Sequence, residues 1–360
     1  MKKLRGRTGK ALRPGGSLSA WSLLGASAVL LALMLSPQGR AFSPLVQLGV
    51  LAAADLALGL GLVRLGSRLA IHLSWLSLTV LVYRIGRLAR PERPPVLKGK
   101  TIAVFGASGG LGAALLAELT HRDVAVVAVT RGSDVTVPHR PLAGQVEIDL
   151  ESPASIERGV QALPDLDAAV FVTGIDVRKP FADHTEDDVA RLLRINLEGP
   201  MLATRQLIGR IRDGGIIAHV GGFADGRLAL PYYTVDVASR AGLAAFSEAL
   251  NRELKLEGRD IVISYLCPEP ADTSAERPFL DLWRSMGSNI TTPAAVARFI
   301  ADALESRPRA RIMGWTSWVI AKINALAPTA ADAIALGRIG RRLREVFGSP
   351  APRSPMSHSK

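Results

Sequence analysis

The chain has 360 residues and a formal net charge of +12, distributed as +13 over residues 1–100, −8 over residues 101–304 and +7 over residues 305–360. The acidic central part argues against a nucleic-acid-binding surface there, whereas the basic ends favour contact with anionic lipid. A single cysteine, Cys267, excludes an intrachain disulfide, and the six scattered histidines show no metal-ligand spacing, so we expect no metal site.

The first 96 residues predict an all-α transmembrane anchor. Residues 18–35 carry no charge and have about the minimum length of a membrane-spanning helix. Residues 44–63 form a second apolar run, broken only by Asp55, whose carboxyl at that depth requires protonation or a partner such as His72. Residues 69–83 form a third run, which is short for a span and suits the membrane interface.

The charges that flank these runs predict the orientation of the anchor. The N-terminal tail is strongly basic, and so is the segment from Arg84 to Lys100, which includes the stiff linker at residues 91–95. The positive-inside rule puts both on the cytoplasmic side, and this requires an even number of crossings. We therefore expect two spans and a globular domain in the cytoplasm. Three spans, or a cleaved signal peptide, would put that domain outside.

A glycine-rich turn organises the globular part. Residues 101–105 suit a buried strand, and residues 113–119 read as a helix. A strand, a glycine turn and a helix in this order place a diphosphate at a helix N-terminus, because glycine allows both the sharp turn and the close approach of the backbone. The alternative is a plain turn. The residues predicted to bind cofactor here are Gly106, Ser108, Gly110, Leu111 and Gly112.

The spacing Gly-x-x-x-Gly-x-Gly resembles that of the short-chain dehydrogenase/reductase family, although Phe105 stands where the family usually has threonine. The resemblance extends from about residue 98 to about residue 312 and implies a nicotinamide cofactor. The alternation of predicted strands and helices supports the same fold class, an α/β Rossmann-type doubly wound parallel sheet. We divide the chain into an anchor (1–96), a dinucleotide-binding domain (97–312) and a basic amphipathic tail (313–360).

The end of the second predicted strand bears on the choice of cofactor. That strand spans residues 124–129, and Arg131 follows it with no acid at the strand end. An acid would bind the ribose 2′-hydroxyl of NAD, whereas an arginine pairs with the 2′-phosphate of NADP. We therefore expect NADP(H) to be favoured over NAD(H). The alternative is that Arg131 is a solvated loop residue.

The resemblance implies further cofactor contacts at the ends of later strands, which we expect at residues 145–150, 168–172, 215–220 and 261–266. The family places an acid against the adenine ring after the third strand, a glycine beside the cofactor after the fourth, and a Pro-Gly-x-x-x-Thr loop beside the nicotinamide. Glu269 replaces the glycine of that loop. The positions that match are Asp149, Leu150, Gly174, Pro268 and Thr273.

The catalytic set of the family, a serine followed by Tyr-x-x-x-Lys, is missing. The segment ASRAG aligns with Ala-Ser-Lys-Ala-Ala, which puts Arg240 at the lysine position and Asp236 at the tyrosine position, and residues 221–223 include no serine. Arg240 cannot release a proton. An i, i+4 ion pair should keep Asp236 ionised and make it a poor acid, so Tyr232 or Tyr233 is the candidate substitute.

A predicted helix at residues 185–197 carries Asn196, close to the family's helix asparagine. The resemblance implies that this side chain supports a water relay; the alternative is that it bonds nearby backbone. Another amphipathic helix is expected at residues 292–303. In the tail, Trp315 and Trp318 precede a basic helix that suits the membrane surface, with core packing or a homo-oligomer contact as the alternative.

Three functions follow from this pattern. The first is an NADP-linked oxidoreductase acting at the membrane on a lipophilic carbonyl or alcohol, with an unusual proton donor. The second is a cofactor-binding sensor or scaffold without turnover. The third is a membrane interaction module that no longer binds cofactor, which the intact glycine turn disfavours. The family resemblance alone favours the first.

Overall fold

The computed structural model describes residues 97–132, 134–137, 141–222, 225 and 229–348, together with Ala53. The predicted spans at 18–35, 44–63 and 69–83 therefore lie outside the described residues, apart from Ala53, which is helical. Within the described part of the chain, no helix is both long and apolar enough to cross a membrane. Contacts divide the chain into two units, Met1–Arg93 and Pro94–Lys360.

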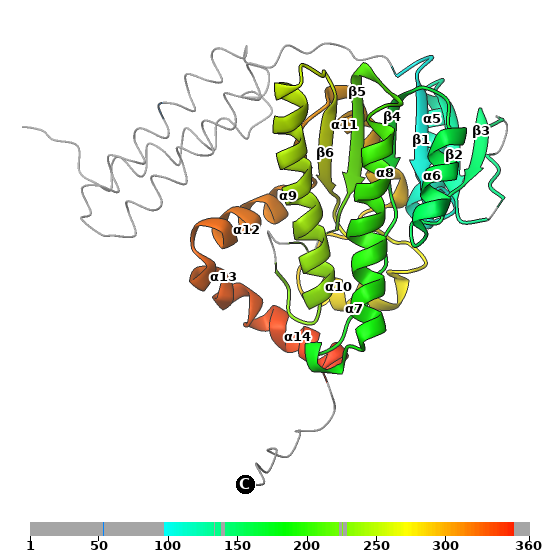
Figure 1. Ribbon diagram of the computed structural model, residues 1–360. Coiled ribbons are helices and arrows are strands. Elements are labelled where there is room, and N and C mark those ends of the chain that lie inside the picture. Colours follow the sequence, from blue (N-terminus) through cyan, green and yellow to red (C-terminus); the bar gives the residue numbers. More distant parts are fainter. Residues whose placement is uncertain are drawn as a thin grey trace, which may run out of the picture. The chain divides into compact units, whose positions relative to one another are not determined.

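Seven parallel strands form one sheet in the order β3-β2-β1-β4-β5-β6-β7 (Figure 1). The order reverses between β1 and β4, and in doubly wound sheets ligands bind at the carboxyl ends of the strands beside this switch point. The predicted Rossmann-type sheet is confirmed. The strands are β1 (Thr101–Phe105), β2 (Ala125–Thr130), β3 (Gly144–Glu147), β4 (Leu166–Phe171), β5 (Ile211–Val220), β6 (Val262–Cys267) and β7 (Ala310–Ile312).

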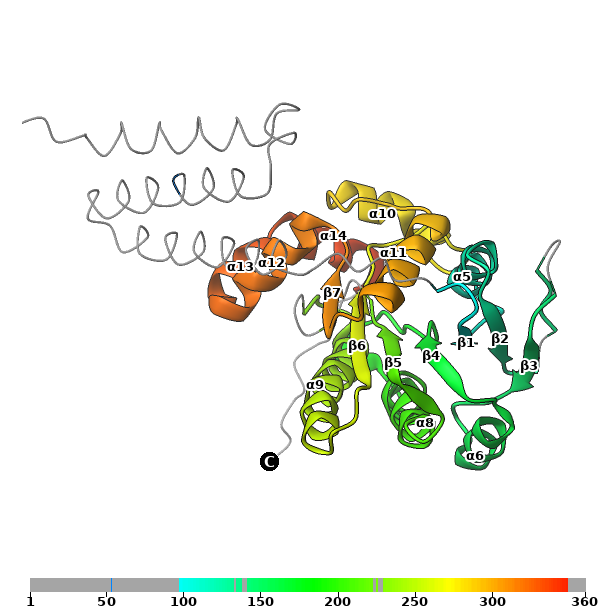
Figure 2. The same ribbon diagram turned by 90° about the horizontal axis from the view of Figure 1, so that it is seen from above.

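Helices cover both faces of the sheet (Figure 2). α5 (Gly110–His121) and α11 (Pro293–Ser306) pack on one face, and α6 (Pro153–Ala162), α8 (Gly199–Leu207) and α9 (Thr234–Leu256) pack on the other. In β1, Ile102 and Val104 join the first core, while Ala103 and Phe105 join the second. Successive side chains of a strand point to opposite faces, so a strand covered on both sides reads as an unbroken apolar run.

The helix predicted at residues 185–197 is interrupted. α7 (Glu186–Leu193) begins with a capping box made by Thr185 and Asp188, and a π-helical turn, η2 (Arg194–Glu198), joins it to α8. Turns of this kind are frequent at functional sites, because the extra residue changes the direction of the side chains. This turn carries Asn196.

The C-terminal part of the described chain forms α12 (Trp315–Leu326), α13 (Pro328–Ala335) and α14 (Arg338–Phe347). Leu343 of α14 is fully buried in a cluster with Tyr233, Leu280 and Trp283. The cluster takes in α10 (Leu280–Ser285), which follows the short turn η3 (Arg277–Phe279). The apolar face of α14 therefore packs on the core, while its arginines are exposed.

Candidate functional site

The glycine-rich turn lies at the carboxyl end of β1. Gly106 has a φ of +81°, and a Cβ there would lie 2.9 Å from Cγ2 of Thr173. At Gly112 a Cβ would lie 2.1 Å from the carbonyl oxygen of Gly106. Both positions therefore require glycine. The contact with Thr173 shows that the turn lies against the loop after β4, at the switch point of the sheet.

The amino end of α5 is open to a ligand. Its N-cap, Gly109, has no side chain to accept from the first-turn amides, and Ser108 beside it is exposed. Uncapped amides at a helix N-terminus bind phosphate well. Thr273 lies close by, with its Cβ and Cγ2 3.3 Å from the position of a Cβ at Gly110, so the loop after β6 reaches the turn as the resemblance implies. The donor set fits a dinucleotide.

Two acidic residues from a later part of the chain lie near Arg131. Its side chain is 63% exposed, and its Nη1 lies 3.5 Å from Oε1 of Glu151. Glu147, at the end of β3, lies 3.5 Å from the position of a Cβ at Gly132. These acids come from β3 and its loop rather than from the end of β2. An incoming 2′-phosphate would have to compete with Glu151 for the arginine.

The predicted strand at residues 145–150 is wrong at its carboxyl end, because β3 stops at Glu147. Asp149 and Leu150 lie in the following turn. Oδ1 of Asp149 accepts from the amide of Glu151 at 3.0 Å, and Leu150 is buried. Asp149 thus shapes the loop that leads into α6. Its place after the third strand is the place at which the resemblance expects the adenine contact.

An arginine joins two carboxyl groups where the family has its catalytic residues. Arg240 donates from Nε to Oδ1 of Asp236 at 2.9 Å and from Nη2 to Oδ1 of Asp176 at 2.8 Å. The predicted i, i+4 pair is therefore present. Asn196 donates to Oδ1 of Asp236 at 3.1 Å and exchanges two hydrogen bonds with the backbone of Ile175. The backbone alternative for Asn196 therefore holds, with the contact to Asp236 added.

Asp176 was missed by sequence reasoning. It lies in the loop after β4, two residues beyond Gly174, and the sequence motif carries no acid at that position. Its position could have indicated it, since a carboxyl that follows a strand end at the switch point faces the ligand crevice. Arg178 in the same loop donates from Nη2 to Oδ2 of Asp176 at 2.8 Å and also pairs with Glu276.

Gly222 gives Arg240 its space. A Cβ at Gly222 would lie 2.6 Å from Nη1 of Arg240, whereas one at Gly174 would lie 3.7 Å from Nη2, an ordinary contact distance. The guanidinium thus occupies the volume that a side chain at position 222 would need, and the resemblance places the family's serine at 221–223. A serine at position 222 would therefore be incompatible with the observed place of the guanidinium.

The two carboxyl groups have opposite pKa shifts. Burial, helped by the nearby Asp176 charge, raises the pKa of Asp236 to about 7 against the pull of Arg240. Burial acts the same way on Asp176, but Arg240 and Arg178 outweigh it and lower the pKa of that carboxyl. The expectation that the ion pair keeps Asp236 a poor acid is therefore wrong, because it left out burial and the second carboxyl.

The two tyrosines belong to an aromatic cluster. Tyr233 is buried, its hydroxyl has no hydrogen-bond partner among the described residues, and burial raises its pKa far above the ordinary value. The guanidinium of Arg178 lies 5.2 Å from the ring of Tyr233 and 4.6 Å from that of Phe279. Tyr232 has a φ of +70°, an uncommon conformation for a bulky residue. Tyr233 is thus a poor substitute acid.

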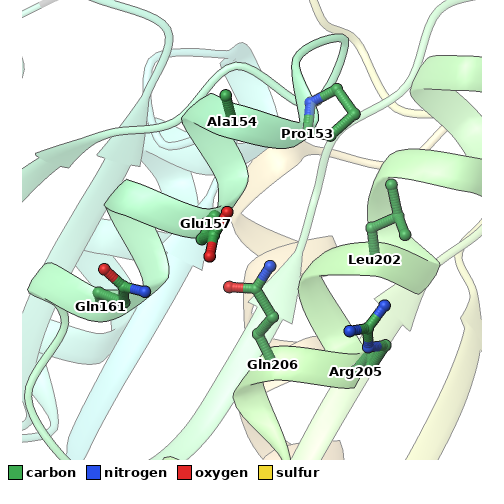
Figure 3. A pocket seen from close by; sticks show the side chains of 7 residues that line it. All are labelled: Pro153, Ala154, Glu157, Gln161, Leu202, Arg205 and Gln206. Carbon is green, nitrogen blue, oxygen red and sulfur yellow. The ribbon is translucent and has the colours of Figure 1, made fainter.

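Of two hollows in the described part of the chain, one lies away from the predicted site and one is lined by residues of the site. A surface pocket of about 460 Å³ between α6 and α8 holds none of the predicted site residues; it is lined by Pro153, Ala154, Glu157, Gln161, Leu202, Arg205 and Gln206 (Figure 3). A cavity of about 10 Å³ is lined by Arg240 and Asn196, among others, and has room for about one water. His219 lines that cavity, and burial lowers its pKa to about 3.

Comparison with known proteins identifies similar chains. The family model described as short chain dehydrogenase matches residues 100–281, half of the chain. Ketoacyl reductase HetN from Nostoc sp. is 26% identical over 264 residues, which cover 66% of this chain and 88% of HetN. The very-long-chain 3-oxoacyl-CoA reductase of Meyerozyma guilliermondii is 29% identical over 47% of this chain, and the match spans only 57% of that relative.

A solved structure agrees with the fold. The short chain dehydrogenase from Burkholderia cenocepacia J2315 in complex with NADP superimposes with a TM-score of 0.59. The match covers 67% of this chain and 98% of the other, at 23% sequence identity. At that level of identity the likeness shows the fold alone.

Proposed function

Because this chain belongs to the short-chain dehydrogenase/reductase family of oxidoreductases, we propose that it uses NADP(H), in preference to NAD(H), to interconvert a lipophilic carbonyl and its alcohol. The observation that carries the proposal is the cradle at the switch point. Gly106 and Gly112 have no room for a side chain, and the N-terminus of α5 is uncapped. The cofactor, when bound, supplies hydride chemistry, and the chain supplies binding, orientation and a proton.

The substrate we propose is a long-chain 3-oxoacyl group. Two relatives are named for reductases of ketoacyl or 3-oxoacyl substrates. A partly exposed aromatic ring beside the carboxyl network supports this choice, because Phe279 packs on Arg178, which bonds Asp176. We further propose that residues 1–96 anchor the chain in a membrane with the globular domain on the cytoplasmic side, for which the support is the charge and length pattern of the sequence.

A sensor or scaffold that binds cofactor without turnover is the second candidate. One observation favours it: the guanidinium of Arg240 fills the space above Gly222, and two carboxyl groups hold it there. The predicted membrane interaction module without cofactor is less well supported, since the glycine cradle is sterically intact.

The first test is a titration of the full-length chain in detergent with NADPH and with NADH. We expect NADPH to bind more tightly, and Arg131→Ala to weaken NADPH binding by about tenfold or more, the value of a charge-assisted contact. Arg252→Ala, which removes another exposed and ion-paired arginine, is the matched control. Equal wild-type affinities would contradict the NADP preference, and binding of neither would contradict the cofactor proposal.

The second test separates the two candidates. Wild-type protein with NADPH is given 3-oxoacyl thioesters of increasing chain length, and cofactor oxidation is followed. Turnover that rises with chain length supports the reductase. Tight NADPH binding with no oxidation across the whole series would favour the sensor.

A further inference from the structure

We propose that Asp176 and Asp236 share one proton and that Asp176 hands it to the substrate oxygen, in place of the tyrosine of the family. The inference rests on the proposed function, the reduction of a carbonyl. It assigns Asp176 as the catalytic residue and Asp236 as the buried positioning residue that holds the proton behind it.

Access distinguishes the two carboxyl groups. The side chain of Asp236 is 2% exposed and that of Asp176 is 26% exposed, so only Asp176 can meet a substrate in the crevice. The two carboxyls are neighbours across one guanidinium, since Asp236 accepts from Nε of Arg240 at 2.9 Å and Asp176 accepts from its Nη2 at 2.8 Å. Two carboxyl groups held this close in a mostly buried place favour a proton on one of them, and such pairs titrate as a unit.

The balance of charge around the pair also requires a proton. Two cations face it, Arg240 from α9 and Arg178 from the loop after β4. Glu276, just before η3, pairs with Arg178 and adds a third carboxyl. Asn196 and the buried phenols of Tyr233 and Tyr265 contribute no charge. With all carboxyls ionised the group would carry an uncompensated negative charge in a mostly buried place, which is costly. One shared proton makes the group neutral.

The same network explains how the proton moves. Asp236 first passes the shared proton to Asp176. When the carbonyl carbon accepts a hydride, its π electron pair moves to oxygen, and Asp176 gives that oxygen the proton. Arg240, hydrogen-bonded to both carboxylates, offsets the charge left behind. Solvent returns one proton through the exposed edge of Asp176. One hydride and one proton convert the carbonyl to an alcohol, and the reverse sequence serves oxidation.

The test uses the full-length chain in detergent and three variants, Asp176→Asn, Asp236→Asn and the control Asp213→Asn. Asp213 also pairs with an arginine, Arg259, but near the start of β5, at the opposite end of that strand from the site. Infrared spectroscopy of the cofactor-free protein follows the protonated carboxyl as pH rises. We expect a band that disappears near pH 7, the value to which the pKa of Asp236 is raised, and that is absent from both site variants but not from the control.

Activity supplies the second measurement. With NADPH and a 3-oxoacyl thioester, Asp176→Asn should lower kcat by about 10²-fold or more with little change in cofactor affinity, as loss of a general acid does. Asp236→Asn should abolish the decline of the reduction rate above neutral pH, which a purely structural role would not do. A band unchanged in both variants, or wild-type kcat and pH profile in both, would overturn the inference. Failure of wild type to bind NADPH would instead refute the proposed function, while the infrared titration still decides the shared proton.

Discussion

Replacing Asp236 with asparagine should change how stability depends on pH. The pKa of this carboxyl rises from 3.8 to about 7 on folding, so the folded chain holds a proton that the unfolded chain has released over that interval. The free energy of unfolding must then fall as pH rises from about 4 to about 7. A shift of about three units corresponds to at most about 4 kcal/mol, because the two carboxyls titrate as a pair. The lowered pKa of Asp176 acts below about pH 4, outside this interval.

Asparagine does not titrate, so the free energy of unfolding of Asp236→Asn should not fall between about pH 4 and about pH 7. Urea unfolding of the full-length chain in detergent, followed by circular dichroism between about pH 4 and about pH 8, gives both curves. The difference in slope is the informative quantity, because a lost hydrogen bond to Arg240 shifts the curve without tilting it. Curves that stay parallel over the whole range, as expected for the Asp213→Asn control, would refute the reasoning.

Three further substitutions test the packing. Gly112→Ala should abolish NADPH binding, since its Cβ would lie 2.1 Å from a carbonyl oxygen, whereas Gly144→Ala, with its nearest contact at 3.8 Å, should bind normally in the same titration. Gly222→Ala should displace Arg240 and cost about 1–3 kcal/mol in urea unfolding. Leu343→Ala should cost about 2–5 kcal/mol, because Leu343 is fully buried, whereas Leu336→Ala, 65% exposed, should be near neutral in the same assay.

The sequence predicted the fold well because its signals were local. The apolar strands, the glycine turn and the alternation with helices each read correctly, although β7 and the π turn at Asn196 were missed. A three-residue edge strand has too little pattern to recognise, and a π turn is set by packing against the neighbouring loop. The end of β3 was misplaced because the apolar residues Ile148 and Leu150 continue the pattern into the turn without extending the strand.

The site was harder to predict because its chemistry depends on residues far apart in the chain. Asp236 and Arg240 lie one helical turn apart, so their pairing could be read from the spacing. Asp176 is 64 positions from Arg240 and meets it only through the sheet topology. The spacing shows only Arg240, which lowers the pKa of Asp236. Burial and the charge of Asp176 raise that pKa instead, and neither can be obtained from spacing.

The departures from the family pattern form a single interdependent change. Arg240 can occupy its place only because position 222 has no side chain, and it stays there because Asp236 and Asp176 hold its two arms. A tyrosine at position 236 would remove one of these carboxyls and leave the buried guanidinium with one carboxylate partner, which would lower the stability of the fold. A serine at position 222 would collide with the same guanidinium. Returning one residue to the family type therefore damages the network without rebuilding the phenol mechanism, and only a joint exchange of positions 222, 236 and 240 removes the conflict.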